Sequence, residues 1–276
     1  MKYQPHLPEQ DNEQNINVSH DQPLKTLFTL LSGVLAIIGV GYGLLGVCVD
    51  FAVDHLPDEV ETLIARQFSL SDPLSNVVQD EFSAYLQTML RELQQCAGVG
   101  YPLQLTLADV DQINAFAIPG GQIVVFTGLI DQLESENGLA FVLAHEISHF
   151  QNRDHLRSMG RGVVIMGLSA LITGADSVIT KLILPTITLG EMRFSQSREL
   201  AADRRALAIL NCRYGHVGGG TEFFSGLLSH ADNAAGSVWG HYFDSHPKAM
   251  ARVERIQQQG DEAGFRVGAV TRLMAR

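Results

Sequence analysis

Three side chains in the stretch FVLAHEISHFQNRDHL, Phe141 to Leu156, have the types and spacing that metal chemistry requires. On a helix, residues four apart lie on one face with Cβ atoms about 5–6 Å apart, so His145 and His149 can both reach one metal ion. Glu146 lies on a neighbouring face, from which its carboxylate reaches a water molecule beside the metal rather than the metal itself. The spacing predicts either a zinc site with its general base or an ordinary helix that carries two histidines.

The residues around the histidine pair favour the metal site. The pair is surrounded by the apolar residues Phe141, Val142, Leu143, Ala144, Ile147 and Phe150. A helix buried on most sides would hold two histidines and a glutamate away from water, which is costly unless a metal supplies a partner. We therefore expect a Zn²⁺ site with His145 and His149 as ligands.

A hydrolytic zinc site also needs a third protein ligand, for which the stretch SRELAADRRALAIL offers Glu199. Glu199 and Asp203 are four residues apart on a predicted amphipathic helix, with small alanines between them. Glu199 would be the ligand, and Asp203 would accept a hydrogen bond from the second ring nitrogen of a histidine. Such an acidic pair alone usually marks a solvated helix face, and only its combination with the histidine pair indicates a metal site.

Composition and net charge indicate which classes of binding partner to expect and which to exclude. The net charge is -11 and no basic patch interleaved with aromatic residues occurs, so a nucleic-acid partner is not expected. Apolar residues make up 46% of the chain, more than a soluble acidic domain needs. We therefore expect part of the chain to contact membrane lipid.

Residues 24–49 are predicted to form one transmembrane helix behind a disordered tail, residues 1–23. No charged residue occurs from Thr26 to Val49, a stretch long enough to cross a hydrocarbon core of about 30 Å. A buried core helix would seldom run this far without a charge. A cleaved signal peptide does not fit the long, partly acidic tail. Glycines such as Gly39 and Gly43 leave room for helix pairing, so a homo-oligomer through this helix is an alternative to a single copy.

The charges around this helix predict its orientation. Lys2 and Lys25 precede it, whereas acidic residues from Asp50 to Glu61 follow it without a basic residue. The positive-inside rule then favours a cytoplasmic amino terminus. We expect a single-pass protein of a bacterial inner membrane, with the catalytic domain in the periplasm.

Residues 50–276 are expected to form one catalytic domain, mainly α with a small β-sheet (α+β). Apolar periodicity predicts helices in PDEVETLIARQF, in the stretch that starts at Asp72-Pro73 and ends at Cys96, and through the histidine motif. YPLQLTLADV alternates like a strand, and two short strands are expected around Pro119-Gly120-Gly121. The last third is predicted to be helical, with a break at Gly218-Gly219-Gly220 and a final helix after Pro247.

Two features stay open at this level. The apolar stretch 162–190 is interrupted by Asp176 and Lys181, so it forms either a helical hairpin packed on the domain or two short membrane spans. Cys96 and Cys212 could pair in an oxidising compartment, but sequence distance does not give spatial distance.

Four motifs in order, NAFAIPGG, LAHEISHFQNRDHLR, SRELAADRRAL and SHPKAMARVERI, resemble a family of zinc metallopeptidases. That family contains the heat-shock protease HtpX, the CAAX prenyl proteases, and periplasmic and mitochondrial quality-control proteases. The resemblance covers about residues 57–256 and implies a zincin-type domain with one zinc ion per chain. It implies that His145, His149 and Glu199 are the ligands. It also implies that Glu146 is the general base and that Asp203 is the family's motif aspartate.

The resemblance also implies how substrate is held. The strand Asn114, Ala115, Phe116 and Ala117 matches the edge strand that pairs with the substrate backbone. His246 matches a histidine near the active site. It would donate a hydrogen bond to the oxyanion, with Tyr242 as second candidate, or block the open zinc position, or serve only structure. His155, six residues past His149, is expected to be structural or to support a ligand.

Two departures from the family pattern bear on function. Gly138 stands where the family often has an acidic residue, a change expected to affect surface charge more than chemistry. The single predicted membrane helix favours the single-anchor or soluble bacterial branch over enzymes for prenylated peptides. The implied function is a zinc-dependent endopeptidase for protein or peptide substrates, such as misfolded membrane or envelope proteins. The alternatives are a catalytically silent scaffold or chaperone, and a multi-span protease for lipidated peptides.

Overall fold

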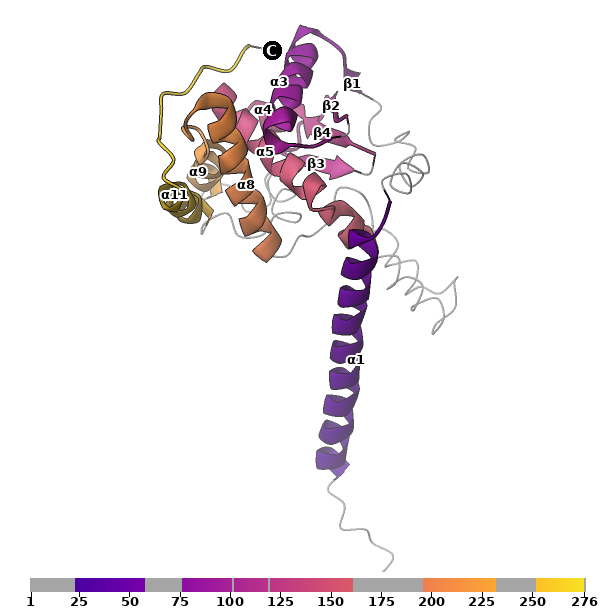
Figure 1. The fold of residues 1–276 in the computed structure, drawn as a ribbon. Coiled ribbons are helices and arrows are strands. Elements are labelled where there is room, and N and C mark those ends of the chain that lie inside the picture. Colours follow the sequence, from indigo (N-terminus) through magenta and orange to yellow (C-terminus); the bar gives the residue numbers. More distant parts are fainter. Residues whose placement is uncertain are drawn as a thin grey trace, which may run out of the picture. The chain divides into compact units, whose positions relative to one another are not determined.

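The computed structural model describes residues 23–57, 76–100, 102–118, 120–160, 196–231 and 252–275 (Figure 1). The chain divides into two units, with the boundary between Cys48 and Val49. Several predictions lie outside the described residues: the tail, the helix near 57–68, the apolar stretch 162–190, and the roles of Tyr242 and His246.

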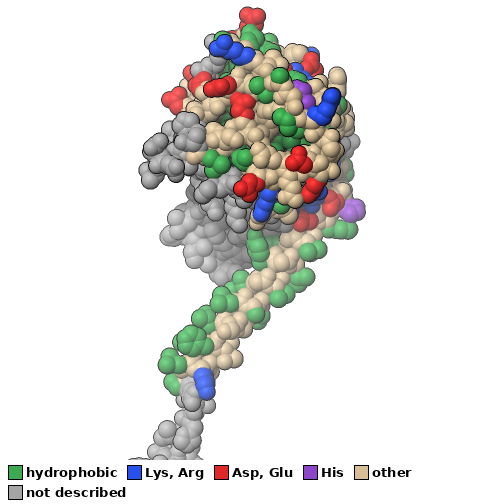
Figure 2. Space-filling model, turned by 90° about the vertical axis from the view of Figure 1, so that its left-hand side faces the viewer, with side chains coloured by type: hydrophobic (Ala, Val, Ile, Leu, Met, Phe, Trp, Pro, Cys, Tyr) green, Lys and Arg blue, Asp and Glu red, His purple; other side chains and the backbone are tan. Residues whose placement is uncertain are grey.

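Helix α1 (Pro23–Asp54) contains the predicted apolar segment. It is the one helix in the described part of the chain that is long and apolar enough to cross a membrane. Nearly all of its large apolar side chains up to Val47 are exposed, and Figure 2 shows apolar side chains along the helix. The helix runs five residues past the expected end at Val49, because Val49 and Val53 are buried in the second unit.

The sheet has four strands in the order β1 (Val77–Val78), β2 (Gln104–Ala108), β4 (Gln122–Phe126) and β3 (Ala115–Ile118). Strands β2 and β4 are parallel, and the other two pairings are antiparallel. The predicted pair of strands around the glycine turn is confirmed. Gly120 and Gly121 have φ of 91° and 83°, a conformation that side chains other than glycine rarely adopt. The turn places β3 at an edge of this sheet.

The helix predicted to start near Asp72-Pro73 begins later, as α3 (Glu81–Ala97). Val77 and Val78 instead pair with β2 as strand β1. The start is fixed by Asp80, whose carboxylate accepts a hydrogen bond from the Ser83 backbone N–H at 2.8 Å, while Ser83 Oγ accepts one from the Asp80 N–H. This reciprocal capping box is a strong helix start, so the sequence prediction was wrong by about two turns.

The core forms where the long helices meet the sheet (Figure 1). After the short helix α4 (Thr127–Ile130) comes α5 (Glu136–Gln151), which packs against α3, β3 and α8 (Gln196–Tyr214). Helices α9 (Glu222–Ala231) and α11 (Arg252–Glu262) follow after the glycine break. Every residue of α5 from Asn137 to Phe150 is buried, as the apolar surroundings of the histidines predicted. The mainly α, α+β fold class is therefore confirmed.

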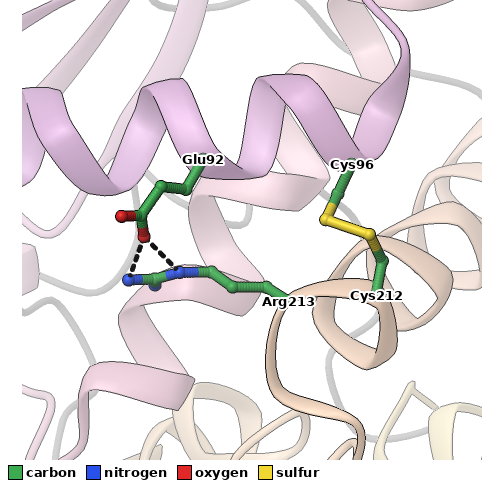
Figure 3. The surroundings of a disulfide bond; sticks show 4 residues. All are labelled: Glu92, Cys96, Cys212 and Arg213. Atoms are coloured by element: carbon green, nitrogen blue, oxygen red, sulfur yellow. Dashed lines mark hydrogen bonds and ion pairs between the residues drawn. A yellow bond between two sulfur atoms is a disulfide. The ribbon is translucent and has the colours of Figure 1, made fainter.

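A disulfide joins the ends of α3 and α8. Cys96 and Cys212 are bonded, with their Cα atoms 5.8 Å apart, which is an ordinary separation for such a bond. Beside it, Arg213 forms an ion pair with Glu92 at 2.7 Å (Figure 3). The structure thus brings Cys96 and Cys212 together, a point that the sequence left open.

The amino-terminal end of α5 explains Gly138. The Glu222 carboxylate, from α9, accepts hydrogen bonds from the backbone N–H groups of Glu134 and Ser135 at 2.7 and 3.0 Å. A Cβ atom on Gly138 would lie 2.8 Å from a Glu222 oxygen. The expectation that Gly138 affects surface charge is therefore wrong. The position is buried, and Glu222 supplies the negative charge that a helix amino terminus favours.

Candidate metal centre

Two helices bring three metal-binding side chains together in the interior. His145 and His149 come from α5 and Glu199 from the first turn of α8. Their ligand atoms all lie within 4.8 Å of one another, and all three residues are buried. The two histidine Nε2 atoms are 3.0 Å apart. The Glu199 oxygens lie 3.2 Å from the Nε2 of His149 and 3.6 Å from that of His145.

This arrangement fits a metal ion better than a network of hydrogen bonds. Two ring nitrogens and a carboxylate, all from buried residues, lie close to a common point. In a tetrahedral zinc site with Zn–N bonds of about 2.0–2.1 Å, the two nitrogens would be about 3.3 Å apart, close to the separation observed. Among the described residues, this is the one cluster of histidine, cysteine and acidic side chains with such geometry.

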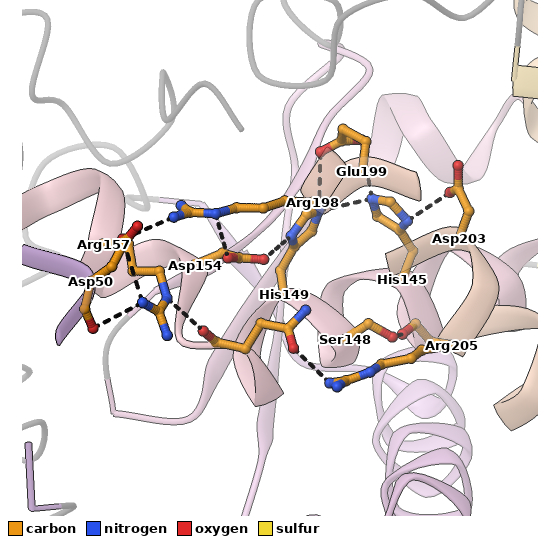
Figure 4. Close-up of polar contacts among 12 residues, drawn as sticks. Asp50, His145, Ser148, His149, Asp154, Arg157, Arg198, Glu199, Asp203 and Arg205 are labelled. Carbon is orange, nitrogen blue, oxygen red and sulfur yellow. Dashed lines mark hydrogen bonds and ion pairs between the residues drawn. The ribbon is translucent and has the colours of Figure 1, made fainter. Parts of the chain in front are cut away.

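The second ring nitrogen of each histidine faces a buried carboxylate (Figure 4). His145 Nδ1 lies 3.0 Å from Asp203 Oδ1, and His149 Nδ1 lies 2.9 Å from Asp154 Oδ2. An acceptor at Nδ1 fixes the tautomer and turns Nε2 toward the metal position. Asp203 thus lies where the sequence placed it, whereas Asp154 was not identified.

The chain turn after α5 explains why Asp154 was missed. Asp154 follows His149 by five residues, which is off its face on a continuous helix. Helix α5 ends at Gln151, and Arg153 then adopts a left-handed conformation with φ of 53°. This turn brings Asp154 back to His149. A left-handed residue other than glycine costs about 1–2 kcal/mol, so only the surrounding contacts can hold it.

A second residue was missed because it comes from a distant helix. Arg252 of α11 is buried, and its guanidinium lies over the Phe224 ring at 4.1 Å from the centroid. Its Nη1 lies 2.8 Å from a Glu199 oxygen, and its Nε donates to Asp203 at 3.0 Å. Arg252 therefore bridges the two acidic residues of α8. It belongs to the motif SHPKAMARVERI, but its type alone does not show burial.

Burial and the neighbouring carboxylates have opposite effects on the pKa values of His145 and His149. Burial alone would lower the pKa of His149, but hydrogen bonds to Asp154 and Glu199 outweigh it and raise the pKa from 6.5 to about 10. For His145, burial and the charge of His149 likewise lower the pKa, and the carboxylates of Asp203 and Glu199 raise it overall. Because a metal binds the unprotonated imidazole, protons compete with the metal at both ligands.

The remaining predicted site residues lie in the following places. Glu146 is buried on α5, and its charge helps to raise the pKa of His149, so it lies near the metal position. Asn114 directly precedes β3, which holds Ala115, Phe116 and Ala117 and packs against α5. His155 is buried and stacks on Phe150 with ring centroids 4.6 Å apart, which agrees with the expected structural role.

The fold and the site together define a class of protein. A mainly helical domain with a small sheet carries an H-E-x-x-H helix, and a second helix adds a glutamate to the same metal position. That combination is the framework of a zincin-type metallopeptidase. Residues 81–259 match the profile of peptidase family M48, and the chain belongs to this family. The resemblance seen in the four motifs is confirmed.

Relatives of the chain whose names describe proteases agree with this family assignment. The beta-barrel assembly-enhancing protease of Yersinia pestis is 33% identical over 169 residues, which cover 52% of this chain and 32% of the relative. Its Escherichia coli counterpart is 29% identical over 159 residues, with the same two coverages. A protease HtpX homolog of Sulfurihydrogenibium is 29% identical over 217 residues, 68% of this chain and 73% of the relative. The chain thus spans about a third of the length of the assembly-enhancing relatives it matches.

Proposed function

We propose that this protein is an endopeptidase that binds one zinc ion per chain and hydrolyses peptide bonds of protein substrates. The observation that carries the proposal is the convergence of His145 Nε2, His149 Nε2 and a Glu199 oxygen. Zinc prefers nitrogen and carboxylate oxygen ligands, and three protein ligands leave one position open for chemistry. When bound, zinc would activate a water molecule and polarise the carbonyl of the scissile bond.

The chain's own residues supply the proton transfers. Glu146 neighbours ligand His145 on α5, which suits a general base that takes a proton from the attacking water and passes it to the leaving amine. Asp203 and Asp154 hold the two histidines in the orientation that binding requires. His246 remains a candidate for stabilising the oxyanion or for blocking the open position, and it lies outside the described residues.

Strand β3 is the proposed place for the substrate backbone. Among the described strands it pairs only with β4, and it packs against the helix that carries the histidines. An extended peptide can add to such an edge by main-chain hydrogen bonds while its side chains enter neighbouring pockets. Misfolded membrane or envelope proteins are the proposed substrates, in keeping with the names of the assembly-enhancing relatives.

We place the catalytic domain in the periplasm, anchored to the inner membrane by α1. Two observations support this location: the basic residues before the uncharged segment Thr26 to Val49 with acidic ones after it, and the disulfide between Cys96 and Cys212. Disulfides persist in oxidising compartments and are rare in the cytosol. An alkaline phosphatase fused after Arg276 should be active, and an inactive fusion would contradict this orientation.

The variant Glu146→Gln tests the proposed function. It keeps the size and polarity of the side chain but removes the base, so zinc should stay bound while cleavage of casein is abolished. His55→Gln provides a control, because His55 is exposed and contacts the backbone oxygen and the ring of Phe51. If Glu146→Gln still cleaved casein at the wild-type rate, Glu146 would not be the base. A wild-type chain that binds zinc but cleaves no protein would favour the scaffold alternative.

A further inference from the structure

A series of ion pairs leads from the carboxyl end of α1 to ligand His149 (Figure 4). Asp50 Oδ1 lies 3.0 Å from the Nη2 of Arg198, at the start of α8. Arg198 Nε lies 3.3 Å from Asp154 Oδ1. The other oxygen of Asp154 lies 2.9 Å from His149 Nδ1. All four residues belong to the unit that starts at Val49.

Two more arginines hold the same end of α1. Arg157 donates to the backbone oxygen of Asp50 at 3.0 Å and forms an ion pair with Asp54. Arg153 donates to the backbone oxygens of Val53, at 3.0 Å, and of Leu56. Arg153 is the residue whose left-handed backbone turns the chain toward His149. The end of α1 therefore contacts both the turn that delivers Asp154 and the arginine that holds it.

We propose that Asp154 is a positioning residue of the metal centre, and that Asp50, acting through Arg198, holds Asp154 in place. The end of the anchoring helix would then be part of the support of a metal ligand. Asp154 uses one oxygen to orient the His149 ring and the other to bind Arg198. The consequence for catalysis rests on the proposed peptidase function, whereas the consequence for metal binding does not.

The exposure of the side chains along this series of ion pairs predicts how much each residue contributes to metal binding. The exposed fraction falls from 35% at Asp50 to 17% at Arg198 and 2% at Asp154. Solvent therefore screens the ion pair between Asp50 and Arg198 more than the buried contact between Asp154 and His149. Loss of Asp154 should therefore weaken metal binding strongly, and loss of Asp50 should weaken it less.

The test measures zinc affinity of the full chain in detergent, by competition with a chelator, together with the visible spectrum of the Co²⁺-substituted protein. Asp154→Ala should lower zinc affinity about 10- to 100-fold and alter the cobalt spectrum. Asp154→Asn should recover part of that loss, because its amide oxygen can still accept from His149 Nδ1. With saturating zinc, kcat should fall while KM stays near the wild-type value.

The contribution of α1 is tested by a matched pair of variants. Asp50→Asn should lower zinc affinity less than Asp154→Ala does, and in the same direction. Asp54→Asn should leave it unchanged, because Asp54 contacts Arg157 but neither Arg198 nor Asp154 in the described contacts. Circular dichroism with excess zinc shows whether each variant is folded.

Two results would overturn the proposal. If folded Asp154→Ala bound zinc as tightly as wild type with an unchanged cobalt spectrum, Asp154 would not position His149. If Asp50→Asn behaved like Asp54→Asn, the end of α1 would not support the site. A wild-type chain that binds zinc but cleaves no protein would refute the proposed function only, since the order of zinc affinities would still be measurable.

Discussion

The disulfide between Cys96 and Cys212 should be a large source of stability for the catalytic domain. It joins two helices of the core across a sequence separation of 116 residues. Closing a loop of that length lowers the chain entropy of the unfolded state and so stabilises the folded state by about 4.9 kcal/mol. Removal of a native disulfide typically costs about 2–5 kcal/mol of stability. The double variant Cys96→Ser/Cys212→Ser should lose stability in that range. Its unfolding midpoint should fall by about 4–20 °C.

Thermal unfolding of the full chain in detergent, with and without a reductant, measures this effect. The reductant should lower the midpoint of the wild type and leave the double variant unchanged. Cys48→Ser is the matched control, because Cys48 is free and exposed and its loss should change nothing. Three free thiols by mass spectrometry of the oxidised wild type, or a midpoint that the reductant does not move, would refute the reasoning.

Three further predictions follow from the charges and packing of the site. Arg252→Met should destabilise the metal-free protein by about 3–5 kcal/mol, since it leaves buried carboxylates without their counter-charge. The metal-bound protein should lose less stability, because the metal also neutralises the charge of Glu199. Denaturant unfolding measures both losses, and an equal loss of stability in the two forms would contradict this reasoning. The raised pKa of His149, about 10 against 6.5, means that its contribution to metal-free stability is full below pH 6.5 and is lost as pH rises through about 10. Zinc affinity, from chelator competition, should rise over the same window, and a flat profile would contradict the raised pKa. Gly138→Ala should cost about 1–3 kcal/mol in thermal unfolding, because its Cβ would displace Glu222, whereas a neutral result would show that Glu222 can move.

Patterns within one helix were readable from the sequence. His145 and His149 share a face because they are four residues apart, and the same spacing on α8 put Glu199 and Asp203 together. The glycine turn that places β3 at the sheet edge was readable for a similar reason, since positive φ favours glycine. Such features depend on local geometry, and the residues that determine them are adjacent in the chain.

Other contacts made by tertiary structure were not readable. Asp154 reaches His149 only because Arg153 adopts a left-handed conformation, and the contacts that hold Arg153 come from a segment about 100 residues earlier. Arg252 enters the site from α11, and Cys96 meets Cys212 through the packing of α3 against α8. In each case the partner is chosen by how helices pack, which a single sequence does not reveal.

Metal analysis of the purified full chain tests the proposed zinc centre most directly. Wild-type protein should contain about one equivalent of zinc, and His145→Ala and Glu199→Ala should lose it together with protease activity. Removal of zinc by a chelator should abolish casein cleavage, and about one added equivalent should restore it. Less than about half an equivalent in the wild type, with no further loss in either variant, would contradict the proposed zinc site.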